Sequence, residues 1–239
     1  MKNVKSIFKK IPKEKLIILL CAIMSAITLA VSVIVFVSAD TEEPRDNTFG
    51  NEFNATQSKP VNFSPEDPKS LEFQRLENNT CIVLSIGAFT GVELEIPEKS
   101  PEGYTVVGIA SGAFEGCEEL ETVHIPSTVI NVGEGVFKGC SSLSMISVDR
   151  ANPKLSAVGG ILYSKSKNVL ICYPCARIGS SYLINPSVNT VAADAFYGVR
   201  YLTKLYYEGT TEEFGQIEVG SGNRIFETLP ITCNYFPSK

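Results

Sequence analysis

The hydrophobic and polar positions divide the chain into three parts of different character. Residues 16–37 form one uninterrupted apolar run, and residues 39–73 are mostly polar with isolated apolar side chains. From residue 74 onward, short apolar runs alternate with polar turns that contain glycine. Long apolar runs are typical of membrane helices, whereas short runs bounded by turn residues are typical of strands. The pattern therefore predicts a transmembrane helix, a linker and a mainly β domain.

The apolar run from Leu16 to Val37 predicts a single transmembrane helix over residues 16–38. Its 22 residues contain neither charge nor proline. A helix of that length spans roughly 33 Å, close to the thickness of a bilayer core. Six lysines lie in the tail before it, and acidic residues follow it from Asp40 onward. The positive-inside rule therefore places residues 1–15 in the cytoplasm as a basic tail, with the rest of the chain outside.

Two interpretations of this segment remain open. As an uncleaved signal anchor, it holds the chain in the cell membrane with the C-terminal domain exposed to the exterior. Alternatively, the small residues that end at Ala39 form an acceptable cleavage site, and cleavage there would secrete the chain. The run is longer than the roughly 7–15 apolar residues of a cleaved signal peptide, which favours the anchor.

Residues 39–73 have the composition of a flexible linker. Prolines interrupt the segment, and its apolar residues, among them Phe49, Phe53 and Phe63, are isolated. A coil of this length reaches on the order of 30 Å, which would hold an anchored domain near the outer membrane face. The phenylalanines could instead dock on the folded domain, and the sequence leaves that alternative open.

Three segments of the remaining chain align with one another without gaps. They cover residues 106–125, 129–148 and 188–207, at offsets of 23 and then 59 residues. Each set of apolar positions is too short to bury itself, so stacked coils would share one interior, about 4.8 Å apart. A glycine that recurs at one place in the coil indicates a turn with positive φ. The matching columns are Phe114, Phe137 and Phe196; Gly116, Gly139 and Gly198; and Leu120, Leu143 and Leu202.

The 23-residue period and the motif A-F-x-G-C-x-x-L-x-x-[VI]-x-I-P resemble the BspA-like leucine-rich repeats of bacterial surface proteins. Residues 113–126 match the motif fully, whereas the later copies depart at Val136, Asp149 and Val199. The resemblance implies a mainly β leucine-rich-repeat solenoid over residues 74–239.

Two parts of that solenoid depart from a simple repeat. Residues 207–239 resemble the family's usual C-terminal coil, and we interpret them as a cap. Residues 149–187 hold the extra length before the third copy. Within them, two apolar runs surround a polar turn at residues 164–168, which predicts a hairpin. We interpret this insertion as an elaborated coil that continues the ladder.

The outward positions of the repeat strands supply a candidate partner-binding face. Side chains alternate across a strand, so the residues between the inward apolar positions point toward solvent. Leucine-rich repeats often bind partners on this face, although an ordinary solvated surface is the simpler alternative. The candidate residues are Thr122, His124, Met145, Ser147, Lys204 and Tyr206.

The cysteines permit a redox interpretation, which the local pattern does not favour. Cys172 and Cys175 form a C-x-x-C motif, but the motif follows a strand, whereas redox motifs of this kind begin a helix. A surface thiol oxidoreductase therefore remains a remote alternative. Cys117 and Cys140 share one repeat position, where a small buried side chain is expected and a disulfide is the alternative. The other cysteines after residue 39 have no repeat mate in this alignment.

Composition and charge narrow the function further. The net charge of −5 argues against nucleic acid as a partner, and a single histidine leaves few options for catalysis or a metal site. We therefore expect no cofactor, no metal and no enzymatic activity. The sequence predicts a membrane-anchored, extracellular protein-binding or adhesion module. The alternative is a scaffold or sensor ectodomain that recruits another envelope protein.

Overall fold

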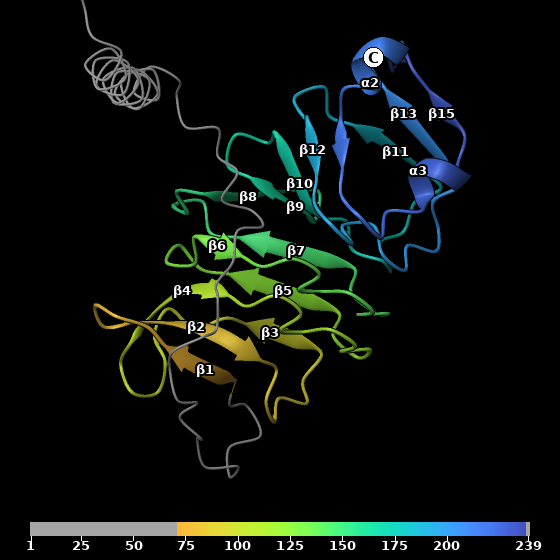
Figure 1. The fold of residues 1–239 in the computed structure, drawn as a ribbon. Coiled ribbons are helices and arrows are strands. Elements are labelled where there is room, and N and C mark those ends of the chain that lie inside the picture. Colours follow the sequence, from red (N-terminus) through yellow and green to blue (C-terminus); the bar gives the residue numbers. More distant parts are fainter. Residues whose placement is uncertain (1–70, 238–239) are drawn as a thin grey trace, which may run out of the picture. The chain divides into compact units, whose positions relative to one another are not determined.

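The computed structural model describes residues 71–237, and the predicted cytoplasmic tail, transmembrane helix and nearly all of the linker lie outside this range. Within residues 71–237, no helix combines the length and apolar character needed to cross a bilayer. The described chain is a mainly β solenoid, in which successive coils are stacked along the sequence (Figure 1).

The first coils contribute strands to two separate sheets. In the three-stranded sheet all pairs are parallel, as expected for coils that repeat in one direction. In the four-stranded sheet β1 pairs antiparallel with β2, and the following pairs are parallel. The four-stranded sheet contains β1 (Glu72–Arg75), β2 (Thr80–Ser85), β4 (Thr105–Ile109) and β6 (Asn131–Val132). The three-stranded sheet contains β3 (Glu93–Glu95), β5 (Thr122–Ile125) and β7 (Met145–Val148).

The inserted residues form strands of their own. The five-stranded sheet has the order β14-β12-β10-β9-β8, and β10 runs antiparallel to β9, which confirms the hairpin. Because β10 also pairs parallel with β12, the insertion joins the ladder of the next coil. The strands are β8 (Leu155–Val158), β9 (Ile161–Ser164), β10 (Val169–Cys172), β12 (Thr190–Val191) and β14 (Glu218–Val219).

The last coils form a parallel sheet in the order β11-β13-β15, accompanied by two short helices. The first helix, α2 (Thr211–Phe214), begins with a capping box in which the side chains of Thr210 and Glu213 each accept a hydrogen bond from the other residue's backbone N–H. The second is α3 (Ile225–Thr228). The strands are β11 (Ser181–Ile184), β13 (Lys204–Tyr207) and β15 (Ile231–Thr232).

The stacked aromatic rings form two groups in two separate hydrophobic clusters, and not the single column that the three aligned repeats predict. Phe114 stacks on Phe137 with ring centroids 5.6 Å apart, as the repeat requires. Phe196 instead stacks at 5.1 Å on Tyr173, which comes from the inserted coil. The C-terminal coil adds Phe226, whose ring meets Phe196 edge-on at 5.4 Å. The insertion thus contributes an aromatic residue of its own to the second group.

The repeated glycines occupy turns that require a left-handed backbone. Gly116, Gly139 and Gly198 have φ of 74°, 75° and 72°, which confirms the turn inferred from their spacing. A second column, two positions before the phenylalanine, also has positive φ, and its third copy is Asp194 with φ of 56°. Aspartate tolerates this conformation better than most residues. Its carboxylate lies 3.5 Å from the Lys138 ammonium of an earlier coil.

Two buried asparagines hydrogen-bond the backbone of neighbouring coils, and the repeat alignment did not reveal them. The Asn152 amide nitrogen donates to the carbonyls of Pro126 and Val129 at 2.8 and 2.7 Å. Its side-chain oxygen accepts from the N–H groups of Lys154 and Leu155 at 3.0 and 2.8 Å. Asn223 serves the C-terminal coil in the same way, accepting from the Phe196 N–H at 2.9 Å. Buried backbone groups thereby keep partners where the coil turns.

Candidate partner-binding face

The outward side of β3, β5 and β7 brings four of the six predicted face residues together. The register pairs Thr122 with Met145 and His124 with Ser147. On the other side of β5, Glu93 pairs with Thr122 and Glu95 pairs with His124. Two rows of outward side chains therefore cross the sheet. One contains Glu93, Thr122 and Met145, and the other contains Glu95, His124 and Ser147.

The remaining two predicted residues lie on a different sheet. Lys204 and Tyr206 belong to β13, which pairs with β11 and β15 and not with β7. There Tyr206 stacks on Tyr235 with ring centroids 3.9 Å apart, and the Lys204 ammonium lies 5.6 Å from the centre of the Tyr206 ring. From the ungapped alignment, the third repeat was expected to continue the sheet of the first two. The insertion separates it from them, and the predicted face is divided between two sheets.

His124 is held in one orientation by its neighbour on β7. Its Nδ1 lies 3.0 Å from the Ser147 hydroxyl oxygen, and that hydroxyl donates to the Val123 carbonyl at 3.3 Å. Because the hydroxyl proton is committed to Val123, Nδ1 must carry the proton shared with Ser147.

A concave site, here called the acidic groove, lies where β3, β5 and β7 end. Its volume is about 420 Å³, and Glu95, Glu98, His124 and Asp149 line it together with apolar residues. The ion pairs found within residues 71–237 join Lys138 to Glu115 and Asp194, so no carboxylate of the groove is paired with a base there. Negative charge in a concavity attracts cationic groups of a binding partner.

The carboxylates of the acidic groove differ in their local hydrogen bonds. The Asp149 side chain accepts from the Ala151 N–H at 2.7 Å, which fixes the turn after β7. Glu98 accepts from the Ser127 hydroxyl at 3.4 Å. Glu95 is exposed and lies directly beside His124 in the ladder. Asp149 stands where the repeat motif has proline, and this departure was the one sequence signal that marked the groove.

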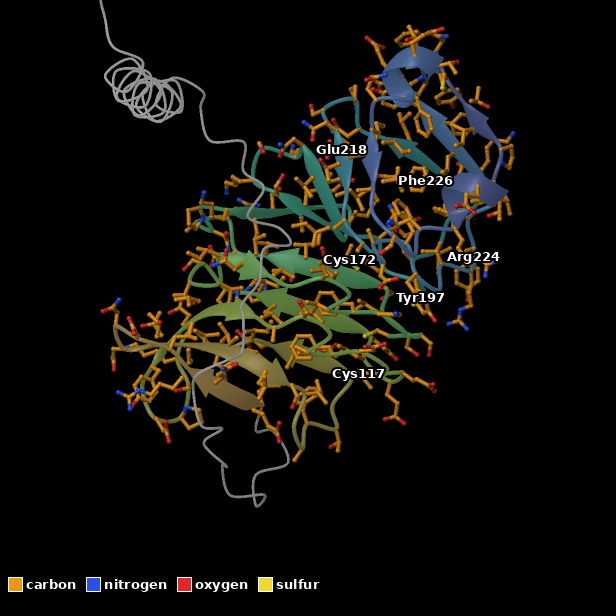
Figure 2. All side chains as sticks on the ribbon, in the orientation of Figure 1. Cys117, Cys172, Tyr197, Glu218, Arg224 and Phe226 are labelled. Carbon is orange, nitrogen blue, oxygen red and sulfur yellow. The ribbon has the colours of Figure 1, made fainter. Side chains whose placement is uncertain are left out.

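The C-x-x-C motif lies beside the repeat cysteines. The Cys175 thiol donates to the Cys140 carbonyl at 2.6 Å, and the Cys140 thiol donates to the Phe114 carbonyl at 3.0 Å. Cys172 and Cys175 thus lie near a repeat cysteine in space, although the alignment gives them no repeat mate. Figure 2 labels Cys117 and Cys172 on their separate coils. The cysteines that the structure describes are free: Cys81, Cys117, Cys140, Cys172, Cys175 and Cys233.

The environment of these thiols does not suit redox chemistry. Burial, together with the neighbouring Cys117 thiol, raises the pKa of Cys140 to about 12. Burial likewise raises the pKa of Cys172 and Cys175 above the usual range. Reactive cysteines need a lowered pKa, because the thiolate is the nucleophile. The geometry therefore supports a packing role for the motif.

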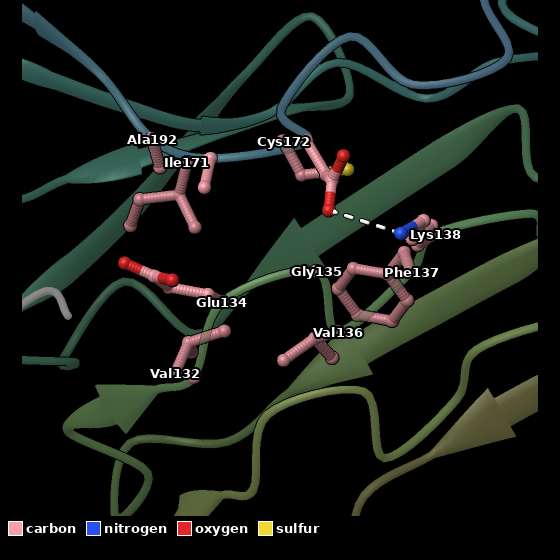
Figure 3. A pocket seen from close by; sticks show the side chains of 12 residues that line it. Val132, Glu134, Gly135, Val136, Phe137, Lys138, Ile171, Cys172 and Ala192 are labelled. Carbon is pink, nitrogen blue, oxygen red and sulfur yellow. Dashed lines mark ion pairs between the residues drawn. The ribbon is translucent and has the colours of Figure 1, made fainter. Parts of the chain in front are cut away.

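A second, much smaller cavity lies between the second repeat and the inserted coil (Figure 3). Its volume is about 20 Å³, and Phe137, Ile171 and Cys172 form part of its wall. Lys138 and Asp194, which also line the cavity, form an ion pair at 3.5 Å, drawn in Figure 3 as the dashed line that ends at Lys138. A cavity needs about 10–15 Å³ to hold one water molecule, so this space is too small for a ligand.

Comparison with known proteins agrees with this geometry. A protein-family model described as BspA type leucine rich repeat region matches residues 84–219 in six copies. The chain belongs to this family. The resemblance inferred from the repeat motif is thereby confirmed, and the BspA-type repeats include the acidic groove. No curated protein matches the chain significantly.

Solved structures with a similar fold include three bacterial leucine-rich-repeat proteins. A cell surface protein from Faecalibacterium prausnitzii has 15% identity and a TM-score of 0.37, covering 73% of this chain and 77% of its own. A leucine-rich-repeat protein from T. pallidum has 18% identity and a TM-score of 0.41, covering 68% of this chain and 82% of its own. The Eubacterium ventriosum protein has 21% identity and a TM-score of 0.40 over 56% of this chain. This chain spans only 44% of that protein.

Proposed function

We propose that this BspA-type protein is a membrane-anchored, surface-exposed binding module, and that the acidic groove receives a basic side chain of a partner protein. The observation that carries the proposal is the row of Glu95 and His124 beside a groove of about 420 Å³. The apolar run at residues 16–37, bounded by lysines on one side and acids on the other, supports the anchor. Its activity is binding and not catalysis.

The surface beside the acidic groove suits contact with a protein. Met145 is 50% exposed, and it lies next to Thr122 in the neighbouring row. Methionine adapts its shape to irregular partner surfaces, so it can supply apolar contact around a charged centre. Carboxylates at such a face increase the rate of encounter with a basic partner and select against acidic ones. An adhesion target outside the cell and a neighbouring envelope protein both remain compatible with this chemistry.

A binding experiment with two sets of candidate partners distinguishes an adhesion target from an envelope protein. Full-length protein in detergent micelles is used as bait against solubilised envelope proteins and, in parallel, against purified matrix proteins. Saturable binding to matrix protein without an envelope partner supports adhesion. Recovery of one envelope protein supports the scaffold alternative.

Replacing Glu95 by glutamine is expected to weaken partner binding about tenfold, because a charge that faces the basic side chain is removed. The matched control is Glu93→Gln, the same change on the same strand, at a residue that does not line the acidic groove. Binding by full-length variants is measured by biolayer interferometry at low and high salt. Equal affinity for Glu95→Gln and the unmodified protein, or equal loss in both variants, contradicts the proposal.

A further inference from the structure

The first coil of the solenoid ends differently on its two sides. On one side the antiparallel strand β1 is added to β2 and is itself the edge of the four-stranded sheet. On the other side β3 is an edge strand, since within residues 71–237 it pairs with β5 alone. An edge strand carries backbone groups without a ladder partner, and these groups favour the addition of another strand.

The hydrogen bonds of β3 show which of its backbone groups face outward. The Val92 carbonyl accepts from β5, and the Ile96 N–H donates to β5 at 3.1 Å. Backbone groups of successive residues in a strand point alternately to its two sides. The N–H and carbonyl groups of Glu93 and Glu95 therefore point away from β5, toward the open edge.

An apolar concavity, here called the terminal groove, adjoins this edge. Its volume is about 510 Å³, and its apolar wall combines Leu71, Phe73 and Phe89 with Leu94 and Pro97 around β3. That volume lies within the roughly 300–1,000 Å³ of ligand-binding concavities. An apolar groove beside an unpaired strand fits an extended peptide, which adds backbone hydrogen bonds and inserts every second side chain.

We propose that the terminal groove binds the chain's own residues 60–64, which add to β3 as a further strand. Val61 and Phe63 alternate with polar residues, a period of two that is typical of a strand with one buried face. Pro60 begins this stretch and Pro65 follows it, and proline is compatible with an edge strand. The described chain begins at Leu71, a few residues after this segment, and Leu71 itself lines the terminal groove. Phe63 is eight residues earlier, a distance of at most about 29 Å along an extended chain.

Attachment to the same chain favours this occupant over a second copy. A connection of only a few residues gives an effective concentration on the order of millimolar, far above that of a separate molecule in solution. A solenoid also needs its terminal coils covered. The C-terminal end has α2 and α3 with Phe226 packed on Phe196, whereas β3 lacks an equivalent cover within the described residues. The two proposals are tested separately, because Glu95 lines both grooves but the added strand would bind its backbone whereas the basic partner would face its carboxylate.

Hydrogen exchange at β3 tests the proposal in the full-length protein in detergent micelles. In the unmodified protein, the N–H groups of Glu93 and Glu95 are expected to exchange slowly. In the double variant Val61→Ser/Phe63→Ser, both are expected to exchange about tenfold faster or more, since their bonds to the added strand are lost. The N–H groups of Leu94 and Ile96, which face β5, should remain protected. The control Phe49→Ser/Phe53→Ser should leave β3 unchanged.

Three results would overturn this assignment. The first is fast exchange of Glu93 and Glu95 in the unmodified protein, which tests the proposal even if the double variant fails to fold. The second is equal protection of both groups in the double variant and the unmodified protein. The third is protection that increases with protein concentration, which would show that a second copy occupies the terminal groove.

Discussion

Replacing Phe196 by alanine is expected to lower the free energy of unfolding by about 3–5 kcal/mol, the cost of truncating a buried phenylalanine. The side chain is only 2% exposed. It contacts the rings of Tyr173, Tyr182 and Phe226 at centroid distances of 5.1, 6.0 and 5.4 Å. These rings come from different coils and cannot close the resulting space without shifting the backbone.

The measurement is urea denaturation of the full-length protein in detergent micelles, followed by circular dichroism. Tyr197→Ala is the control, because Tyr197 adjoins Phe196 in sequence but is 44% exposed. Its replacement should cost less than about 1 kcal/mol, as for most surface changes. Similar losses for the two variants would contradict an interior shared between coils.

Asn152→Ala is expected to cost about 3–5 kcal/mol, because four backbone groups, three of them on buried residues, lose their partner at once and each buried unsatisfied group costs roughly 1–3 kcal/mol. The asparagine side chain is fully buried, and its four hydrogen bonds span 2.7 to 3.0 Å. The individual costs do not add fully, since the turn can relax and water can enter.

The matched control for this change is Asn185→Ala. The Asn185 side chain accepts one hydrogen bond, from the Ser187 N–H at 2.9 Å, at a partly exposed turn. Its loss should cost about 1 kcal/mol or less. Thermal denaturation of both variants measures the difference. Equal shifts in melting temperature would show that Asn152 does not hold neighbouring coils together.

Side-chain periodicity made much of the fold predictable. Phe114 and Phe137 stack because a 23-residue period puts the same residue at the same place in successive coils. The positive φ of Gly116 follows from the same reasoning. The aromatic partner of Phe196 was not predictable, because Tyr173 belongs to a coil of different length. The structural role of Asn152 was not predictable, because its side chain bonds to backbone carbonyls of the preceding coil and no repeated residue type marks that position.

The candidate site was predictable only in part, because the repeat pattern places residues on strands but does not show where different coils meet. Alternation along β5 and β7 placed Thr122, His124, Met145 and Ser147 on the outward face, and the sheet register brings them together. The acidic groove also needs Glu95, from a first coil that lies outside the three aligned segments. Concavity arises from how strand ends and turns of several coils meet, and no local pattern encodes it.

The most direct test of the binding face places a photoreactive amino acid at Met145 in the full-length protein within intact cells. We expect a discrete cross-linked product from Met145, and we expect this product to disappear when Glu95→Gln is added. The same photoreactive group in place of the exposed Tyr197, which lies in a turn outside the sheet, should give no such product. Equal cross-linking from both positions, or a Met145 product that is insensitive to Glu95→Gln, would contradict a partner bound at the acidic groove.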